Sequence, residues 1–238
     1  MKVGPNILGS KSLVFSVDAG NKKSYTGSGN GWRNKAGRGT DGTLENGTIY
    51  NTTALGCMDF DGTDDFASIE VDTAVFNYQS PFTISCWFYI DSLVSSTNAR
   101  LWDKSNEATS GRRADREKTD AGFALIIKTD GTNNTLVPAL DGAQTSMAIS
   151  VDTLRWNHIS AVYNTSSVSL ALNGGSYTTV SHSGNLSNIT TTNNLTIGNV
   201  LRGNRPLDGK VSNLQMYNKV ISVSENRNNY RVTKSRYQ

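Results

Sequence analysis

The sequence contains few of the residues on which most catalytic and metal sites depend. Among its 238 residues there are two cysteines and two histidines, and their spacings do not form a recognisable zinc site. A Ser-His-Asp relay could use only His158 or His182, and no motif surrounds either one. The few glutamates are scattered, at positions 45, 70, 107, 117 and 225. We therefore expect no enzymatic activity, no catalytic residues and no metal site.

Long apolar runs are also absent, so no segment is predicted to span a membrane. The N-terminus, Met1-Lys2-Val3-Gly4-Pro5, lacks the apolar core of a signal peptide. The net charge of +3, from 23 basic and 20 acidic residues, is too small to indicate nucleic-acid binding. We expect a soluble protein, assembled in a reducing cytoplasm, that binds neither membranes nor nucleic acid.

The two cysteines are predicted to stay unpaired. Alternation places Met58 and Phe60 toward the core, so Cys57 should point away from it, whereas Cys86 shares a face with Ile84. Side chains that point in opposite directions cannot form a disulfide without backbone movement.

The clearest structural pattern lies in residues 155–173. Two β-rich runs flank the polar tetrad Asn164-Thr165-Ser166-Ser167, which favours a turn. Apolar residues alternate with small ones in the second run, and the first run is largely apolar on both faces. Asn173-Gly174-Gly175 then supplies residues that tolerate the positive φ angles of a tight turn. The stretch is predicted to form the centre of an antiparallel β-domain.

The same stretch carries a family resemblance. Residues 156–163 and 170–174 resemble the W-x-H-x-x-x-V-Y … L-x-x-N-G hairpin of laminin-G-like domains, which are jelly-roll modules of the concanavalin A-like lectin and glucanase superfamily. Residues 18–25, Trp32 and residues 42–47 resemble the D-A-G-N-x-K-S-Y … W … G-T-L-x-N-G opening of such domains in tailed-phage virion proteins. This opening is the strongest indication of a viral source.

Further segments resemble the same family, at residues 58–69, 82–90, 195–198 and 209–218. With these matches, the resemblance covers about residues 13–231 and implies a single domain over 1–238. The implied fold is all-β, a two-sheet antiparallel jelly-roll sandwich. Ser222 and Glu225 have the spacing of a capping box, so a short C-terminal helix is predicted from Ser222 to about Val232.

One acidic stretch leaves two interpretations open. Its aspartates lie at positions 59, 61, 64 and 65. An EF-hand loop counted from Asp59 would need glycine at its sixth and glutamate at its twelfth position, and has neither. The stretch therefore predicts either a turn closed by Asx hydrogen bonds or a calcium ligand set. Residues 34–40 and Ser212 lack the acidic residues usual in the family, so no cofactor is predicted.

The leading functional hypothesis is a non-catalytic structural protein of a phage virion. The glucanases of the superfamily use an E-x-D-x-E carboxylate pair, and that pattern does not occur here. A capsid decoration protein, or another surface-displayed module, would contact capsid or tail proteins. A homo-oligomer is a further alternative, and a glycoside hydrolase is disfavoured.

The alternative is a lectin-like adhesion protein of the tail or fibre, which binds host surface glycans. Aromatic faces stack on sugar rings while polar groups orient them. The candidates are Trp32, Trp87 and Trp102. Trp87 lies on the face opposite Phe82 and Ile84, where it would serve equally well to cover the sheet or to meet a partner.

Two segments are candidates for binding a protein partner. Arg112 and Arg113 lie in a highly charged stretch, residues 103–120, predicted to be either a solvated loop or a grip on a carboxylate or phosphate. The second segment, residues 219–238, has five basic residues and one acidic residue. Either its helix simply packs on the sandwich, or it docks on an acidic patch. The predicted docking residues are Arg231, Lys234, Arg236 and Tyr237. Removing residues 233–238 is then predicted to leave folding intact.

Overall fold

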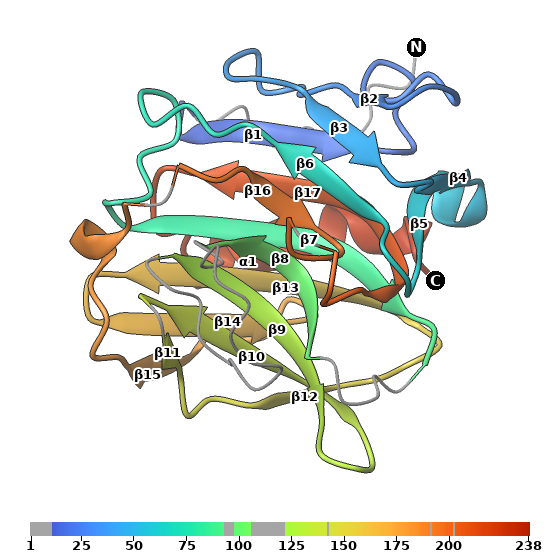
Figure 1. Cartoon of the computed structure of the whole chain (residues 1–238). Coiled ribbons are helices and arrows are strands. Elements are labelled where there is room, and N and C mark those ends of the chain that lie inside the picture. Colours follow the sequence, from blue (N-terminus) through green and yellow to red (C-terminus); the bar gives the residue numbers. More distant parts are fainter. Residues whose placement is uncertain (1–10, 93–97, 106–121, 142, 191, 202) are drawn as a thin grey trace.

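The computed structural model of the chain describes residues 11–92, 98–105, 122–141, 143–190, 192–201 and 203–238. Two antiparallel sheets face each other, and one helix lies across the outside of one sheet (Figure 1). The predicted all-β sandwich with a short C-terminal helix is confirmed. Among the helices within these ranges, none is long and apolar enough to cross a bilayer.

The first sheet, which we call sheet A, has the strand order β15-β14-β13-β7-β17-β5-β4, with β1 paired to β17. Its strands are β1 (Leu13–Asp18), β4 (Ile49–Asn51), β5 (Cys57–Asp61), β7 (Phe82–Ile90), β13 (Trp156–Asn164), β14 (Ser167–Leu172), β15 (Thr178–Ser181) and β17 (Asp208–Tyr217).

The second sheet, sheet B, has the order β11-β10-β9-β8-β16-β6-β3-β2, with β12 paired to β10. Its strands are β2 (Gly31–Trp32), β3 (Gly42–Glu45), β6 (Phe66–Ile69), β8 (Ala99–Lys104), β9 (Phe123–Thr129), β10 (Asn134–Leu140), β11 (Ala143–Gln144), β12 (Ile149–Val151) and β16 (Leu195–Ile197). The described helices are α1 (Val223–Thr233) and the 3-10 turns η1 (Thr53–Leu55), η2 (Leu186–Asn188) and η3 (Lys234–Arg236).

Strand β7 illustrates how the two sheets form one core. Alternate residues of β7 point into the hydrophobic cluster between the sheets, as the sequence predicts. These residues are Phe82, Ile84, Cys86, Phe88 and Ile90. The ring centroid of Phe82 lies 4.7 Å from that of Phe123 on β9, in the opposite sheet. Burying each such side chain contributes about 1.5–3 kcal/mol, so the alternation fixes which face of β7 is inside.

The predicted hairpin of residues 155–173 is β13 and β14. Asn164 and Ser167 are the last paired residues before the turn. Strand β13 pairs with β14 on one side and with β7 on the other, which confirms an interior position in the sheet. After β14, Asn173 and Gly174 have φ values of 49° and 72°, the left-handed conformation that the sequence predicts there.

Both cysteines are buried and free. Cys86 belongs to the core cluster, whereas Cys57 does not, in agreement with their predicted opposite directions. Burial raises the pKa of the Cys57 thiol to about 12, which keeps it protonated and unreactive at neutral pH.

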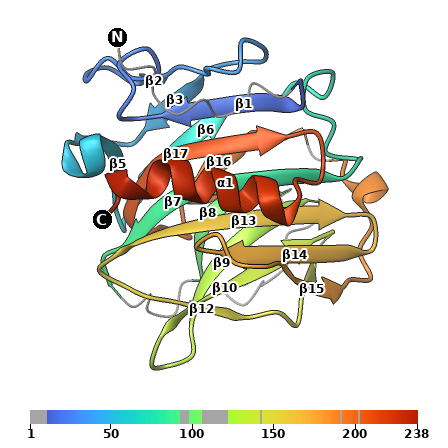
Figure 2. The same ribbon diagram turned by 180° about the vertical axis from the view of Figure 1, so that it is seen from behind.

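Helix α1 begins where the capping box predicts. The Ser222 hydroxyl accepts a hydrogen bond from the Glu225 amide, and the Glu225 carboxylate accepts one from the Ser222 amide. The helix lies across the outer face of sheet A, where Figure 2 shows it as the outermost element on that side. The extent of the domain, residues 1–238, stays a prediction.

Candidate functional site

The side of the C-terminal segment that faces sheet A, which we call the inner side, packs around Trp87 on β7. Its ring lies between those of Tyr230 and Tyr237, with centroid distances of 5.4 and 4.1 Å and nearly parallel planes. The Trp87 indole N–H also donates to the Thr233 hydroxyl at 2.9 Å. Trp87 is 3% exposed. Trp87 is therefore the residue against which α1 packs. Covering the sheet in this way is one of the structural roles predicted for it.

The prediction that three tryptophans bind a glycan is wrong. Trp32 and Trp102 are buried in the core, and the Trp102 indole donates to the hydroxyl of Tyr163. Trp87 is covered by the C-terminal segment. A sugar ring can stack only on an accessible aromatic face, and none of the three offers one. The alternation in the sequence placed Trp87 correctly on the outer face of β7 but did not reveal that the C-terminal segment covers it.

The side chain of Arg236 holds together parts of the molecule that are distant in sequence. Its guanidinium donates to the backbone carbonyls of Ala54 and Gly56 at 2.6 and 2.9 Å. It also donates to the Asp18 carboxylate at 2.7 Å and to the Ser212 hydroxyl at 2.6 Å. The side chain is 15% exposed. The predicted docking role of Arg236 is therefore wrong, because its donors are already used inside the protein.

Tyr237 is buried as well. Its hydroxyl donates to Ser212 at 3.0 Å and accepts from the Asn213 amide at 3.3 Å, beneath the ring stack on Trp87. The prediction that Tyr237 contacts a partner is wrong for the same reason. Residues 233–238 are part of the packed structure, so they are not the free tail that the prediction of unaffected folding assumed.

The loop that Arg236 grips has an unusual backbone. Ala54 and Leu55 have φ values of 50° and 61°, and Gly56 has 133°. Successive left-handed conformations are costly for residues with a Cβ atom. A Cβ at Gly56 would lie 2.8 Å from the Ala19 carbonyl oxygen. The guanidinium of Arg236 thus stabilises a strained turn, and no local sequence pattern indicated that turn.

The outward side of α1 and of the adjoining turn η3 carries three cations, which we call the basic stripe: Arg227, Arg231 and Lys234. Arg227 and Arg231 are exposed, and Lys234 is half-buried. Within the described ranges, none of the three has a side-chain hydrogen bond or an ion pair. Arg231 and Lys234 thus have the availability that the docking prediction requires. Arg227 was missed, although its spacing of four from Arg231 indicates the same side. The predicted residues Arg112 and Arg113 lie outside the described residues.

A small cleft opens on another side of α1, next to the end of β17. Its volume is about 180 Å³. It is lined by Tyr217, Lys219, Ile221, Ser224, Glu225, Asn228 and Asn229. Lys219 and Glu225 form an ion pair, which helps to hold the pKa of the Glu225 carboxyl below its usual value. The Asn229 amide donates to the Tyr217 hydroxyl at 3.2 Å. The Asn228 side chain has no partner among the described residues.

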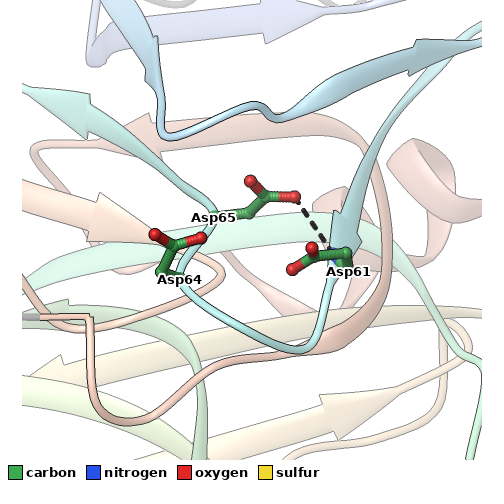
Figure 3. Close-up of side chains that lie close together, drawn as sticks. All are labelled: Asp61, Asp64 and Asp65. Atoms are coloured by element: carbon green, nitrogen blue, oxygen red, sulfur yellow. Dashed lines mark hydrogen bonds between the residues drawn. The ribbon is translucent and has the colours of Figure 1, made fainter.

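The acidic stretch forms the turn between β5 and β6. Carboxylate oxygens of Asp61, Asp64 and Asp65 lie within 4.8 Å of one another (Figure 3). The Asp61 carboxylate accepts from the Thr63 amide, which confirms the Asx turn, and Asp65 accepts from the Asp61 amide. Burial raises the pKa of Asp65, with the neighbouring aspartates adding to the effect.

Asp59 does not belong to this group, because it accepts from Asn51 and lies near Lys210. The three remaining carboxylates are hard oxygen ligands of the kind that calcium takes. A calcium site there stays a prediction.

The central strands of sheet B carry a single carboxylate. Asp103 is the one carboxylate on its five neighbouring strands β10, β9, β8, β16 and β6. It pairs with Arg100 at 2.9 Å and accepts from the Ser105 hydroxyl, and both partners of the ion pair are buried. Burial raises the pKa of Asp103, although Arg100 and Ser105 oppose that shift.

His158 is equally shielded. Its Nε2 lies 3.0 Å from the Ser85 hydroxyl on the neighbouring strand, which confirms the predicted hydrogen bond within the sheet. Burial lowers the pKa of His158 to about 3, so the ring is neutral at physiological pH. This Ser–His pair lies under Trp87 and Tyr230, where a substrate has no access.

Residues 61–225 match a family model described as the concanavalin A-like lectin/glucanases superfamily. No curated protein matches the chain. Among solved structures, the chain is similar to domain 4 of AbnA, an extracellular arabinanase from Geobacillus stearothermophilus, in complex with arabinotriose. The TM-score is 0.65 and the identity 12%, over 91% of this chain and 97% of that one.

Two further solved structures are similar. For a mutant sialidase of Trypanosoma rangeli that displays trans-sialidase activity, the TM-score is 0.65 and the identity 16%, over 94% of this chain. The chain spans only 33% of that sialidase. For the structure named HCR/D-Sa-GBL1/C, the TM-score is 0.67 and the identity 14%, over 93% of this chain and 52% of that one. At these identities the likeness concerns the fold.

Proposed function

Because the chain belongs to the concanavalin A-like lectin/glucanases superfamily, we propose that it is a non-catalytic binding module of a phage particle. It acts through protein–protein contacts, as a capsid decoration protein or another surface-displayed component of the virion. Its partners are capsid or tail proteins.

The proposal that the protein is non-catalytic rests on one observation: the central strands of sheet B hold a single carboxylate, and it is already engaged. Glycoside hydrolysis by the general two-carboxylate mechanism needs an acid and a nucleophile or base on either side of the scissile bond. The five neighbouring strands β10, β9, β8, β16 and β6 offer only Asp103. That side chain is buried and occupied by Arg100 and Ser105. A single engaged carboxylate does not supply both roles.

The phage context is supported by the opening of the chain, residues 18–25 with Trp32 and residues 42–47, which resembles that of virion modules. In the structure these residues have structural roles. Asp18 accepts hydrogen bonds from Gly20 and Arg236, and Trp32 lies in the core. The motif therefore supports the proposal as a marker of the type of domain, and the binding surface lies elsewhere.

Two measurements test the proposal. Purified protein incubated with arabinan, β-glucans and sialosides, with and without calcium, should release no reducing ends or free sugar. Release that disappears in an Asp103→Asn variant would identify an enzyme. Separately, phage particles assembled without the protein should take up purified protein to a fixed number of copies per particle. Particles that take up none would contradict the virion role.

A second candidate function is glycan binding, and one comparison favours it. The arabinanase domain that this chain resembles over 97% of its length was solved in complex with arabinotriose. In the present chain the cleft beside α1 has suitable chemistry. The Lys219–Glu225 ion pair neutralises its own charges, which favours an uncharged ligand. The Asn228 side chain is available to hydrogen-bond hydroxyl groups, and Ile221 provides an apolar wall.

This cleft is smaller than the 300–1,000 Å³ typical of sites for drug-sized ligands, so it fits one neutral sugar ring rather than an extended chain. A glycan array and calorimetry with arabinotriose would test this candidate. Binding should weaken at least tenfold in an Asn228→Ala variant and should persist in a control variant, Asn77→Ala, in a loop outside the cleft. Absence of binding to any neutral glycan would exclude it.

A further inference from the structure

The positive charge of the chain is concentrated in residues 219–238, which hold five basic residues and one acidic residue and so carry a net +4. Because the whole chain carries +3, the residues before this segment sum to −1. Two of the five cations are used internally: Lys219 by Glu225, and Arg236 by Asp18. The three that remain within the described structure are those of the basic stripe.

The spacing of the stripe gives it a defined shape. Residues 227, 231 and 234 are four and three positions apart. Lys234, the C-cap of α1, keeps helical backbone angles, so the three side chains project from the same side. The seven residue steps from Arg227 to Lys234 span about 10 Å along the helix axis. Figure 2 shows that α1 is the outermost element on its side of the sandwich, so a partner surface can approach it.

The helix that carries the stripe is held firmly in place. An isolated helix of 11 residues would be marginal in water. Here the capping box fixes the first turn, the Trp87 stack holds the middle, and Arg236 anchors the residues that follow. The three cations therefore project from a fixed backbone, which lowers the entropy that binding would cost.

From these observations we infer that the basic stripe, Arg227, Arg231 and Lys234, is the surface that docks on an acidic patch of another virion protein. The inference rests on the proposed function and names its contact surface. Guanidinium groups suit this role because they bind carboxylates in a bidentate manner and stay charged at every physiological pH.

The charge of the remaining surface favours a protein partner over nucleic acid. An extended polyanion would reach beyond the 10 Å stripe onto a body whose formal charges sum to −1. A discrete cluster of aspartate and glutamate side chains matches the stripe without meeting those charges. The complementary surface is thus small and acidic.

The test is a triple charge reversal, Arg227→Glu, Arg231→Glu and Lys234→Glu, measured by uptake onto particles assembled without the protein. A matched control reverses three exposed cations elsewhere that make no described side-chain contact: Lys23→Glu, Arg33→Glu and Lys35→Glu. At about 0.1 M salt we expect the stripe variant to bind at least tenfold more weakly and the control to stay within twofold. Raising the salt should weaken wild-type uptake, because exposed charge pairs are screened. Both variants should keep the wild-type melting temperature to within about 2 °C.

The outcomes separate the inference from the proposed function. If wild type and both variants bind equally, the stripe is not the contact, although the protein is still a virion component. If both variants weaken binding equally, the effect is one of overall charge and the inference fails. If wild type does not bind, both the inference and the proposed function fail. A gel-shift assay with duplex DNA should show no binding, and a shift that the stripe variant abolishes would overturn the choice of a protein partner.

Discussion

Arg231 and Arg236 are five residues apart, and the structure uses them in opposite ways. Arg236 is directed inward and donates four hydrogen bonds to Asp18, Ala54, Gly56 and Ser212. Arg231 is directed outward, and within the described residues nothing pairs with it. Both were predicted to be docking residues, and only the exposed one is available for that role.

The difference shows that the environment determines the role of a cation in this segment. A guanidinium has five N–H donors and cannot be deprotonated in a protein, so burying it requires acceptors on several sides. The strained loop at Ala54–Gly56 supplies two of them, and Asp18 supplies a charge. No described residue offers such acceptors on the outward side of α1, so its cations remain available to another molecule.

Deleting residues 234–238 should have the largest effect on stability. This removes Arg236 with its four hydrogen bonds and Tyr237 with its stack on Trp87. Losing a buried aromatic ring alone typically costs 3–5 kcal/mol. We therefore expect the free energy of unfolding to fall by about 5 kcal/mol or more, measured by urea titration. A truncated protein with wild-type stability would show that the inner side is not structural.

A smaller loss of folding stability is expected at acidic pH, and it arises from His158, which lies beneath the inner side. Because its folded pKa is about 3, the folded protein does not take up the proton that the unfolded chain binds below about pH 6.5. The His158 contribution is complete above pH 6.5 and decreases as the pH falls toward 3. Between pH 6.5 and 4 the loss should be on the order of 3 kcal/mol. The difference in stability between wild type and His158→Gln should shrink by that amount, and a pH-independent difference would contradict the assignment.

The features that the sequence predicted correctly depend on neighbouring residues. Alternation located the β13–β14 hairpin and the inner face of β7, and the Ser222–Glu225 spacing located the start of α1. The Asx turn at Asp61 is equally local. Each is determined within a few residues of the chain, which is the range over which periodicity and capping act.

The contacts that decided the candidate sites span far greater distances along the chain. Arg236 bonds to Asp18 across 218 positions, and Trp87 bonds to Thr233 across 146. No sequence pattern encodes such pairs, so an outward-facing Trp87 was indistinguishable from a sugar-binding one. The same limit explains why Arg236 was grouped with Arg231.

Single substitutions of Arg236 and Arg231 should differ in their effect on stability. Arg236→Met should lower the free energy of unfolding by about 2 kcal/mol, because it removes four hydrogen bonds and leaves the Ala54 carbonyl without a described donor and Asp18 without its ion pair. The matched change Arg231→Met should stay within about 0.5 kcal/mol, as expected for an exposed position. Denaturant midpoints of the two proteins provide the measurement. If both substitutions lowered the free energy of unfolding equally, Arg236 would be no more important to the structure than Arg231.

The smallest expected effect concerns the N-terminal end of the helix, which supports both sides equally. The Ser222 hydroxyl satisfies the Glu225 amide, and the Glu225 carboxylate returns a hydrogen bond to Ser222. Replacing an N-cap serine by alanine costs about 1 kcal/mol, whereas glycine costs only a few tenths. Ser222→Ala should therefore destabilise the protein by about 1 kcal/mol and Ser222→Gly by less, as measured by thermal unfolding. Neither should change uptake onto particles, because the basic stripe begins beyond the first turn and the Trp87 stack still positions it. If Ser222→Ala weakened uptake as strongly as the charge reversal, the position of the stripe would depend on the cap rather than on the packed inner side.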